Sequence, residues 1–100
     1  MIRHIVMFSL IAPDETQKDA DVIEVRARLR ALVGVIPGLQ SIIFERDLGL
    51  VANHLDAVLV SEHDDNAALE AYQAHELHRA AAEFIGAVTG PGRAVVDYSV

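Results

Sequence analysis

Apolar and polar positions divide the chain into six segments, four of which have the pattern of β-strands. These four are short apolar runs bounded by turn-forming residues, at 2–10, 39–47, 55–62 and 94–100. Alternate residues of a strand face opposite sides of its sheet. The first strand is apolar on both sides, with Val6 and Phe8 on one and Ile5 and Met7 on the other. The second and third strands show the same double-sided pattern, so we expect a sheet with two apolar faces.

The other two segments have the spacing of amphipathic helices. In the first, which we predict over residues 15–33, apolar side chains recur at steps of three and four: Val22, Val25, Leu29, Leu32 and Val33. Asp14 with Gln17 resembles a capping box at its start, and Gly34 ends it. The second runs from residue 67 to 88 with an apolar side formed by Leu69, Tyr72, Leu77, Ala81, Phe84 and Val88. Because this pattern spans two ordinary helix lengths, we expect an interruption near His75.

The order β-α-β-β-α-β predicts a single α+β domain over residues 1–100, with the ferredoxin-like arrangement of a four-stranded antiparallel sheet and its helices on one face. On the first strand, the even-numbered row should face the helices: Ile2, His4, Val6, Phe8 and Leu10. The helices cannot cover the second apolar face, and soluble monomers rarely expose a large contiguous apolar patch. We therefore expect a homodimer in which two sheets pack against each other.

Composition narrows the class of protein further. The chain is 52% hydrophobic and 23% charged, has a formal net charge of −7 and contains no cysteine, which excludes disulfides and thiolate sites. Half of its eight Lys and Arg residues fall in the first helix, where a solvated face explains them, so we expect no nucleic-acid partner. No apolar run approaches the about 20 residues of a membrane helix, and the N-terminal segment resembles a strand rather than a signal peptide. We expect a cytoplasmic protein with no membrane partner.

Residues suited to proton transfer concentrate in the second helical segment. Tyr72, His75 and His78 follow one another at steps of three, which places a phenol and two imidazoles on one helix face. Asp97 interrupts the apolar run of the last strand, and a buried carboxylate needs a hydrogen-bonding partner. An acid–base site can be built from these parts, with His78 as general base or acid, Asp97 orienting it and Tyr72 donating a hydrogen bond to a substrate oxygen. His4 would add a polar contact, and His75 would shape the helix.

Plainer interpretations of the same residues stay open. The two helix histidines can be a partly exposed pair, Tyr72 can be a core ring, and Asp97 can pair with Arg93 or Arg3. The histidines in His75-Glu76-Leu77-His78 are three apart, not four as in the zinc motif His-Glu-x-x-His, so we expect no metal and no cofactor. His54 and His63 flank the third strand, where we expect surface positions.

Five short motifs, in the right order over essentially the whole chain, resemble the stress-responsive dimeric α/β-barrel (Dabb) domain family. They are Ile-Arg-His-Ile-Val-Met-Phe at 2–8, Ile-Pro-Gly-Leu at 36–39, Asp-Ala-Val-Leu-Val-Ser-Glu at 56–62, Leu-Glu-Ala-Tyr-Gln-Ala-His-Glu-Leu-His at 69–78 and Val-Asp-Tyr at 96–98. The resemblance implies a ferredoxin-like protomer whose sheet packs on that of its twin, forming a dimeric α/β barrel.

The resemblance also implies a site. The family includes olivetolic acid cyclase, a plant polyketide cyclase whose functional positions match His4, Tyr72, His78 and Asp97 here, with His78 as the base held by Asp97. Further substrate contacts would come from Phe8, Val25, Leu29 and His75. Two positions depart from the pattern: Glu76 stands where the family's His-Pro-x-His has proline, and Ala57 stands where the cyclase has a histidine on its third strand.

Two classes of function follow from the residues and the resemblance together. The first is a stress-responsive protein that binds or converts a small aromatic or polyketide-like molecule by His/Tyr acid–base chemistry, as a polyketide cyclase-like lyase or isomerase. The second is a non-catalytic, stress-associated homodimer in which the same residues form a buried polar network.

Overall fold

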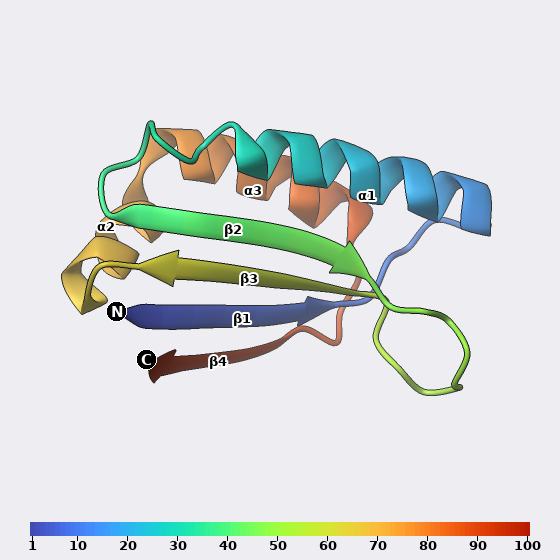
Figure 1. Ribbon diagram of the computed structural model, residues 1–100. Helices are drawn as coiled ribbons and strands as arrows, with labels where there is room; N and C mark the ends of the chain where they lie inside the picture. The colour runs from blue at the N-terminus through green and yellow to red at the C-terminus, as the bar shows by residue number, and fades with distance from the viewer.

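Residues 1–100 are all described by the computed structural model, and the observed elements follow the predicted order (Figure 1). They are β1 (Ile2–Phe8), α1 (Glu15–Arg30), β2 (Leu39–Arg46), β3 (Ala57–His63), α2 (Asn66–Ala74), α3 (Glu76–Val88) and β4 (Ala94–Ser99). The strands form one antiparallel sheet in the order β2-β3-β1-β4, which confirms the ferredoxin-like fold. The interruption expected near His75 is real, because it separates α2 from α3.

The helices lie on one face of the sheet. Figure 1 shows α1 and α3 running along that face, with α2 at the end where both chain termini lie. The even-numbered row of β1 faces them as predicted, since His4, Val6, Phe8 and Leu10 are all buried. Val6, Phe8 and Leu10 belong to one apolar core together with Val22, Val25 and Leu29 of α1.

The start of α1 is capped as expected, and its end differs. Asp14 accepts a hydrogen bond from the backbone N–H of Gln17 at 2.8 Å, but the Gln17 side chain donates to Asp21, so only half of the capping box forms. The helix ends at Arg30, three residues earlier than predicted. After Ala31, the N–H groups of Leu32 and Val33 bond three residues back, which tightens the chain into turns, and Leu32 is still buried.

A glycine brings β2 close to α2. Gly38 follows Pro37 with φ of +84°, and a Cβ there would lie 2.6 Å from the Cβ of Ala68. Only glycine accepts both the left-handed backbone and this close approach. The predicted Ile-Pro-Gly turn therefore sets how α2 meets the sheet.

His75 makes the break between α2 and α3. Its backbone is extended, with φ of −67° and ψ of 136°, and its Nδ1 accepts the N–H of Leu77 at 3.1 Å, as an N-cap side chain does. The break also shifts the apolar side of the segment. Leu77, predicted to face the core, is 44% exposed, and Ala81 and Ile85 are the buried residues of α3.

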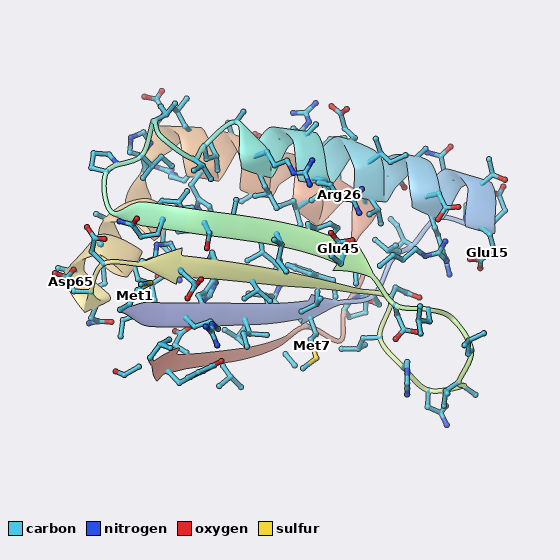
Figure 2. The ribbon with its side chains drawn as sticks, viewed as in Figure 1. Met1, Met7, Glu15, Arg26, Glu45 and Asp65 are labelled. Atoms are coloured by element: carbon cyan, nitrogen blue, oxygen red, sulfur yellow. The ribbon has the colours of Figure 1, made fainter.

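No element of the chain covers the opposite side of the sheet, which we call the free face. The odd-numbered row of β1 lies there with its cross-strand partners, and side chains at its centre are exposed: Met7 39%, Ile43 48% and Val96 56%. Figure 2 shows Met7 at this side of the sheet. One end of the free face is polar, because Arg3 pairs with Glu62 and donates to the Tyr98 hydroxyl at 2.7 Å. The prediction of a two-faced apolar sheet is confirmed.

None of the helices has the length and apolar character needed to cross a membrane.

Candidate functional site

A cavity of about 210 Å³ lies between the sheet and the α2–α3 segment. Its polar lining comes from His4, Tyr72, Gln73, His78 and Arg93, and its apolar lining includes Val6, Phe8, Leu59 and Ile85. Residues from both ends of the sequence therefore meet at one cavity. It is the place where the predicted acid–base groups come together.

His4 is held by Asp97. The register of β1 and β4 sets the two residues opposite each other, and His4 Nδ1 lies 2.5 Å from Asp97 Oδ1. A carboxylate accepts, so Nδ1 of His4 carries the proton that it donates to Asp97, and this bond fixes the orientation of the ring. This corrects the predicted pairing of Asp97 with His78, because the carboxylate lies on the strand beside β1 and takes the imidazole of that strand. Arg3, an alternative partner, is engaged with Glu62 and Tyr98.

His78 stands over the cavity from α3 and is half-buried. Its Nδ1 lies 3.3 Å from the carbonyl oxygen of Gln73. Since a carbonyl only accepts, Nδ1–H donates, and the basic nitrogen is Nε2. Burial lowers the pKa of His78, and the charges of His4 and His75 lower it further, while the Gln73 bond opposes the shift. The ring is therefore neutral at pH 7 and suited to accept a proton.

Tyr72 is 1% exposed and lies between two imidazoles. Its ring centroid is 4.2 Å from that of His78 and 4.7 Å from that of His63. Its hydroxyl is buried and has no hydrogen-bond partner in the chain. Burial raises the pKa of Tyr72, so the group stays protonated and can donate one hydrogen bond. A buried hydroxyl without a partner is costly, and a bound water or ligand that reached it would offset this cost.

The sequence prediction named neither Gln73 nor Arg93 as a site residue, although both line the cavity, and it missed the burial of His63, which packs against Tyr72 without lining the cavity. His63 was expected at the surface but is 0% exposed, with Nε2 2.8 Å from Ser61 Oγ and Nδ1 without a partner. Burial lowers its pKa, and the charge of His4 adds to this effect. The alternation of β3 could have predicted the burial of His63. The buried, helix-facing row of this strand consists of Ala57, Leu59, Ser61 and His63. The predicted strand ended one residue too early to include it.

The remaining predicted residues lie in different places. Phe8 lines the cavity, whereas Val25 and Leu29 are core residues away from it, because α1 packs over β2 and the cavity lies under α2 and α3. His75 caps α3 rather than lining the cavity. His54 is exposed and bonded to Asp47, as expected of a surface histidine.

No three His, Asp or Glu side chains in the chain gather as ligands of a metal ion would. His75 and His78 each use Nδ1 in a hydrogen bond with the backbone of their own segment. Of these two histidines, His75 caps α3 and His78 lines the cavity.

A second hollow of about 300 Å³ opens near Met7 and Val58, at the edge of the free face beside the loop that joins β2 to β3. Its only imidazole is that of His54, which is exposed and paired with Asp47. Although this hollow is larger, the acid–base groups lie in the cavity on the helix side, and we assign the site there.

The family model described as the stress responsive A/B barrel domain, Dabb, matches residues 2–100. The chain belongs to the Dabb family. Among curated proteins, none matches it.

Solved structures similar to this Dabb chain share its fold. A dimeric ferredoxin-like protein of unknown function from Thermobifida fusca is 32% identical, with a TM-score of 0.80 over 99% of this chain and 90% of that one. A Dabb family protein from Mesorhizobium loti is 21% identical, with a TM-score of 0.74 over 99% of this chain and 95% of that one. The hydroxynitrile lyase of Passiflora edulis is 16% identical, with a TM-score of 0.74 over 99% of this chain and 92% of that one.

Proposed function

We propose that this Dabb protein binds a small aromatic or polyketide-like carbonyl compound in the cavity beside α2 and α3 and converts it by acid–base chemistry. One observation carries the proposal: His4, Tyr72 and His78 line the same cavity, and the buried hydroxyl of Tyr72 has no hydrogen-bond partner in the chain. A mostly apolar cavity with a few convergent polar groups and shifted pKa values is typical of a small-molecule site.

The proposed step is proton abstraction next to a carbonyl. His78 Nε2 accepts the proton from carbon, and the electron pair of the broken C–H bond passes into an enolate. The Tyr72 hydroxyl donates to the enolate oxygen, where negative charge develops. His4, oriented by Asp97, supplies a second polar contact, and protonated His78 afterwards returns its proton to the product. The neutral state of His78 at pH 7 supports this role.

The fold is compatible with such chemistry. The Passiflora protein of the same fold is a hydroxynitrile lyase. Fold alone does not carry an activity from one protein to another. The proposal therefore depends on the residues of the cavity.

The functional unit that we propose is a homodimer joined through the free face. That face exposes Met7, Ile43 and Val96 at its centre, which a partner sheet would remove from water. The Thermobifida relative, 32% identical over 99% of this chain, is dimeric. The cavity lies on the opposite side of the sheet, so each protomer would keep its own.

The second candidate is a non-catalytic, stress-associated homodimer. The near-complete burial of Tyr72 and His63 favours it, because residues of a structural network need no access to solvent. In that case a ligand panel would leave the histidine signals unchanged, and substitutions in the cavity would change stability alone.

An NMR titration separates the two candidates. Ring signals of His78 are followed while aromatic and β-keto compounds are added, with the exposed His54 as an internal control. We expect the His78 signals to shift in a saturable manner and those of His54 to stay in place. Unchanged His78 signals at millimolar ligand would favour the non-catalytic homodimer.

A further inference from the structure

A single guanidinium lies at the cavity without an acidic partner. We propose that Arg93 binds the carboxylate of the ligand, so that the cavity selects small apolar carboxylic acids such as aryl or β-keto acids. The inference rests on the proposed small-molecule site and names the substrate class of that site.

The backbone fixes Arg93 where β4 begins beside the end of β1. The turn before it is bonded to Ser9, whose Oγ donates to the Pro91 carbonyl at 2.6 Å and whose carbonyl accepts the N–H of Gly90 at 3.0 Å. Gly92 adopts φ of +95°, a conformation that favours glycine. These contacts hold the residue next to Phe8, the last residue of β1.

The Arg93 side chain uses this position to cover the cavity wall. Its guanidinium carbon lies 4.9 Å from the ring centroid of Phe8, and both residues line the cavity. A guanidinium stacked on an aromatic face keeps the N–H groups of its edge available for a planar anion. An apolar ligand body lying against Phe8 would place a terminal carboxylate near them.

Arg93 is one of three arginines without an acidic partner, and among these three it alone lines the cavity. Acidic residues outnumber basic ones by 15 to 8, and most arginines are paired: Arg3 with Glu62, Arg26 with Glu45, Arg28 with Glu24, and Arg46 with Glu15 and Asp19. Arg93 forms neither a salt bridge nor a side-chain hydrogen bond. Arg30 and Arg79 form no salt bridge either, but neither lines the cavity.

The rest of the cavity suits an anion. No Asp or Glu lines it, because Asp97 lies behind His4 and is bonded to it. Tyr72 and Gln73 add hydrogen-bond donors, while Val6, Phe8, Leu59 and Ile85 form apolar walls. The volume of about 210 Å³ is below the about 300 Å³ at which pockets for drug-sized ligands begin, so a single-ring acid fits best. The chain has no glycine-rich phosphate loop, so a carboxylate is favoured over a phosphate group.

The test compares carboxylates with their neutral amides. Benzoate and benzamide, cinnamate and cinnamamide, and inorganic phosphate are titrated at pH 7.5 and low salt, with the His78 ring signals as the readout. The variants are Arg93→Gln, Arg93→Lys and, as a matched control, Arg79→Gln, an exposed arginine of α3 outside the cavity. Because Arg93 is itself exposed, its substitution should leave the fold intact, which an amide NMR spectrum checks.

We expect wild type and Arg79→Gln to bind each carboxylate at least about tenfold more tightly than its amide, the usual effect of a charged hydrogen bond. Arg93→Gln should bind both members of a pair alike, and Arg93→Lys should restore part of the preference. Equal binding of carboxylate and amide by wild type, or an undiminished preference in Arg93→Gln, would overturn the anion role while leaving the small-molecule site standing. Tighter binding of phosphate than of carboxylates would overturn the choice of ligand class. Binding of no probe would contradict the site itself, and this inference with it.

Discussion

At the scale of single residues, the Tyr72 hydroxyl separates a working site from a structural one. A hydroxyl that already has a protein partner loses a hydrogen bond when it is removed, whereas this one has no partner to lose. Its removal should therefore affect the ligand rather than the fold. Nδ1 of His63 is the other buried side-chain atom without a partner, but His63 does not line the cavity and is bonded to Ser61 through Nε2.

Tyr72→Phe should leave the free energy of unfolding within about 1 kcal/mol of wild type, or raise it, because it deletes an unsatisfied buried group. Turnover of a carbonyl substrate should fall about 10²- to 10³-fold, as when a donor to a developing oxyanion is lost. Urea unfolding and steady-state kinetics measure the two effects. A variant that is several kcal/mol less stable would show that the hydroxyl has a structural role.

His63 should make the protein sensitive to acid. Burial lowers the pKa of His63 in the folded state. Below about pH 6.5, the ordinary pKa of histidine, the unfolded chain therefore binds a proton more readily than the folded chain does. Stability is then complete above that value and falls as the pH drops toward the folded pKa. His63→Gln, which can still bond to Ser61, should lose less stability between pH 7.5 and 5.5 than wild type does. If wild type and His63→Gln lose the same free energy of unfolding between the two pH values, as measured by urea unfolding, the assignment is contradicted.

Residue identities predicted the site in part. His4 could be named from the alternation of its strand, and Tyr72 and His78 from their residue types and their spacing on the helical segment. The partner of Asp97 could not be predicted, because alternation gives the face on which a strand residue lies but not the register of its strand against a neighbouring strand. His63 was missed at a strand end, where a boundary error of one residue hides a whole position.

At the scale of elements, His75 determines where α2 ends and α3 begins. The family pattern has a proline after this histidine, and the chain has Glu76. The break persists without the proline because the His75 side chain accepts the N–H of Leu77, one of the free N–H groups at the start of α3. Glu76 lies in the first turn, where a negative charge is favourable. This cap places His78 over the cavity.

His75→Ala should therefore lower the free energy of unfolding by about 1 kcal/mol, the usual cost of losing an N-cap side chain. His75→Ser, which restores a capping oxygen, should recover most of that loss. Thermal or urea unfolding of the three proteins measures it. If Ser is no better than Ala, the capping role is wrong.

The element pattern was the most predictable level of the structure. Apolar periodicity gave all four strands, both helical segments and the break, because these depend on local spacing. The end of α1 and the outward position of Leu77 differed from the prediction, because the tight turns after Arg30 and the shift at His75 depend on tertiary packing. The same limit explains Val25 and Leu29, whose periodicity predicts burial but cannot tell core from cavity.

At the scale of the whole molecule, the sheet separates two surfaces with different roles. The helix side holds the cavity, and the free face remains uncovered within one chain. We expect the free face to associate with a second copy. That association would leave the cavities on the outer sides of the two sheets.

Ile43→Lys should convert the dimer to a monomer, because it places a charge in the apolar centre of the free face, where Ile43 is 48% exposed in one chain. Ile23→Lys is the matched control, since Ile23 is 62% exposed on α1 and lies away from the sheet. Sedimentation equilibrium at micromolar concentration should give the dimer mass for wild type and the control. A monomeric wild type would remove the basis for a sheet-to-sheet interface.

We propose that His78 removes a proton from carbon in this cavity. The most direct measurement is the rate of exchange of the α-protons of phenylpyruvate and benzoylacetone into D₂O, followed by ¹H NMR with wild type and His78→Gln. We predict that wild type accelerates the exchange and that His78→Gln returns it to the rate in buffer, while His54→Gln exchanges like wild type. A rate equal to that in buffer for wild type with ligand bound, or undiminished exchange in His78→Gln, would contradict the account.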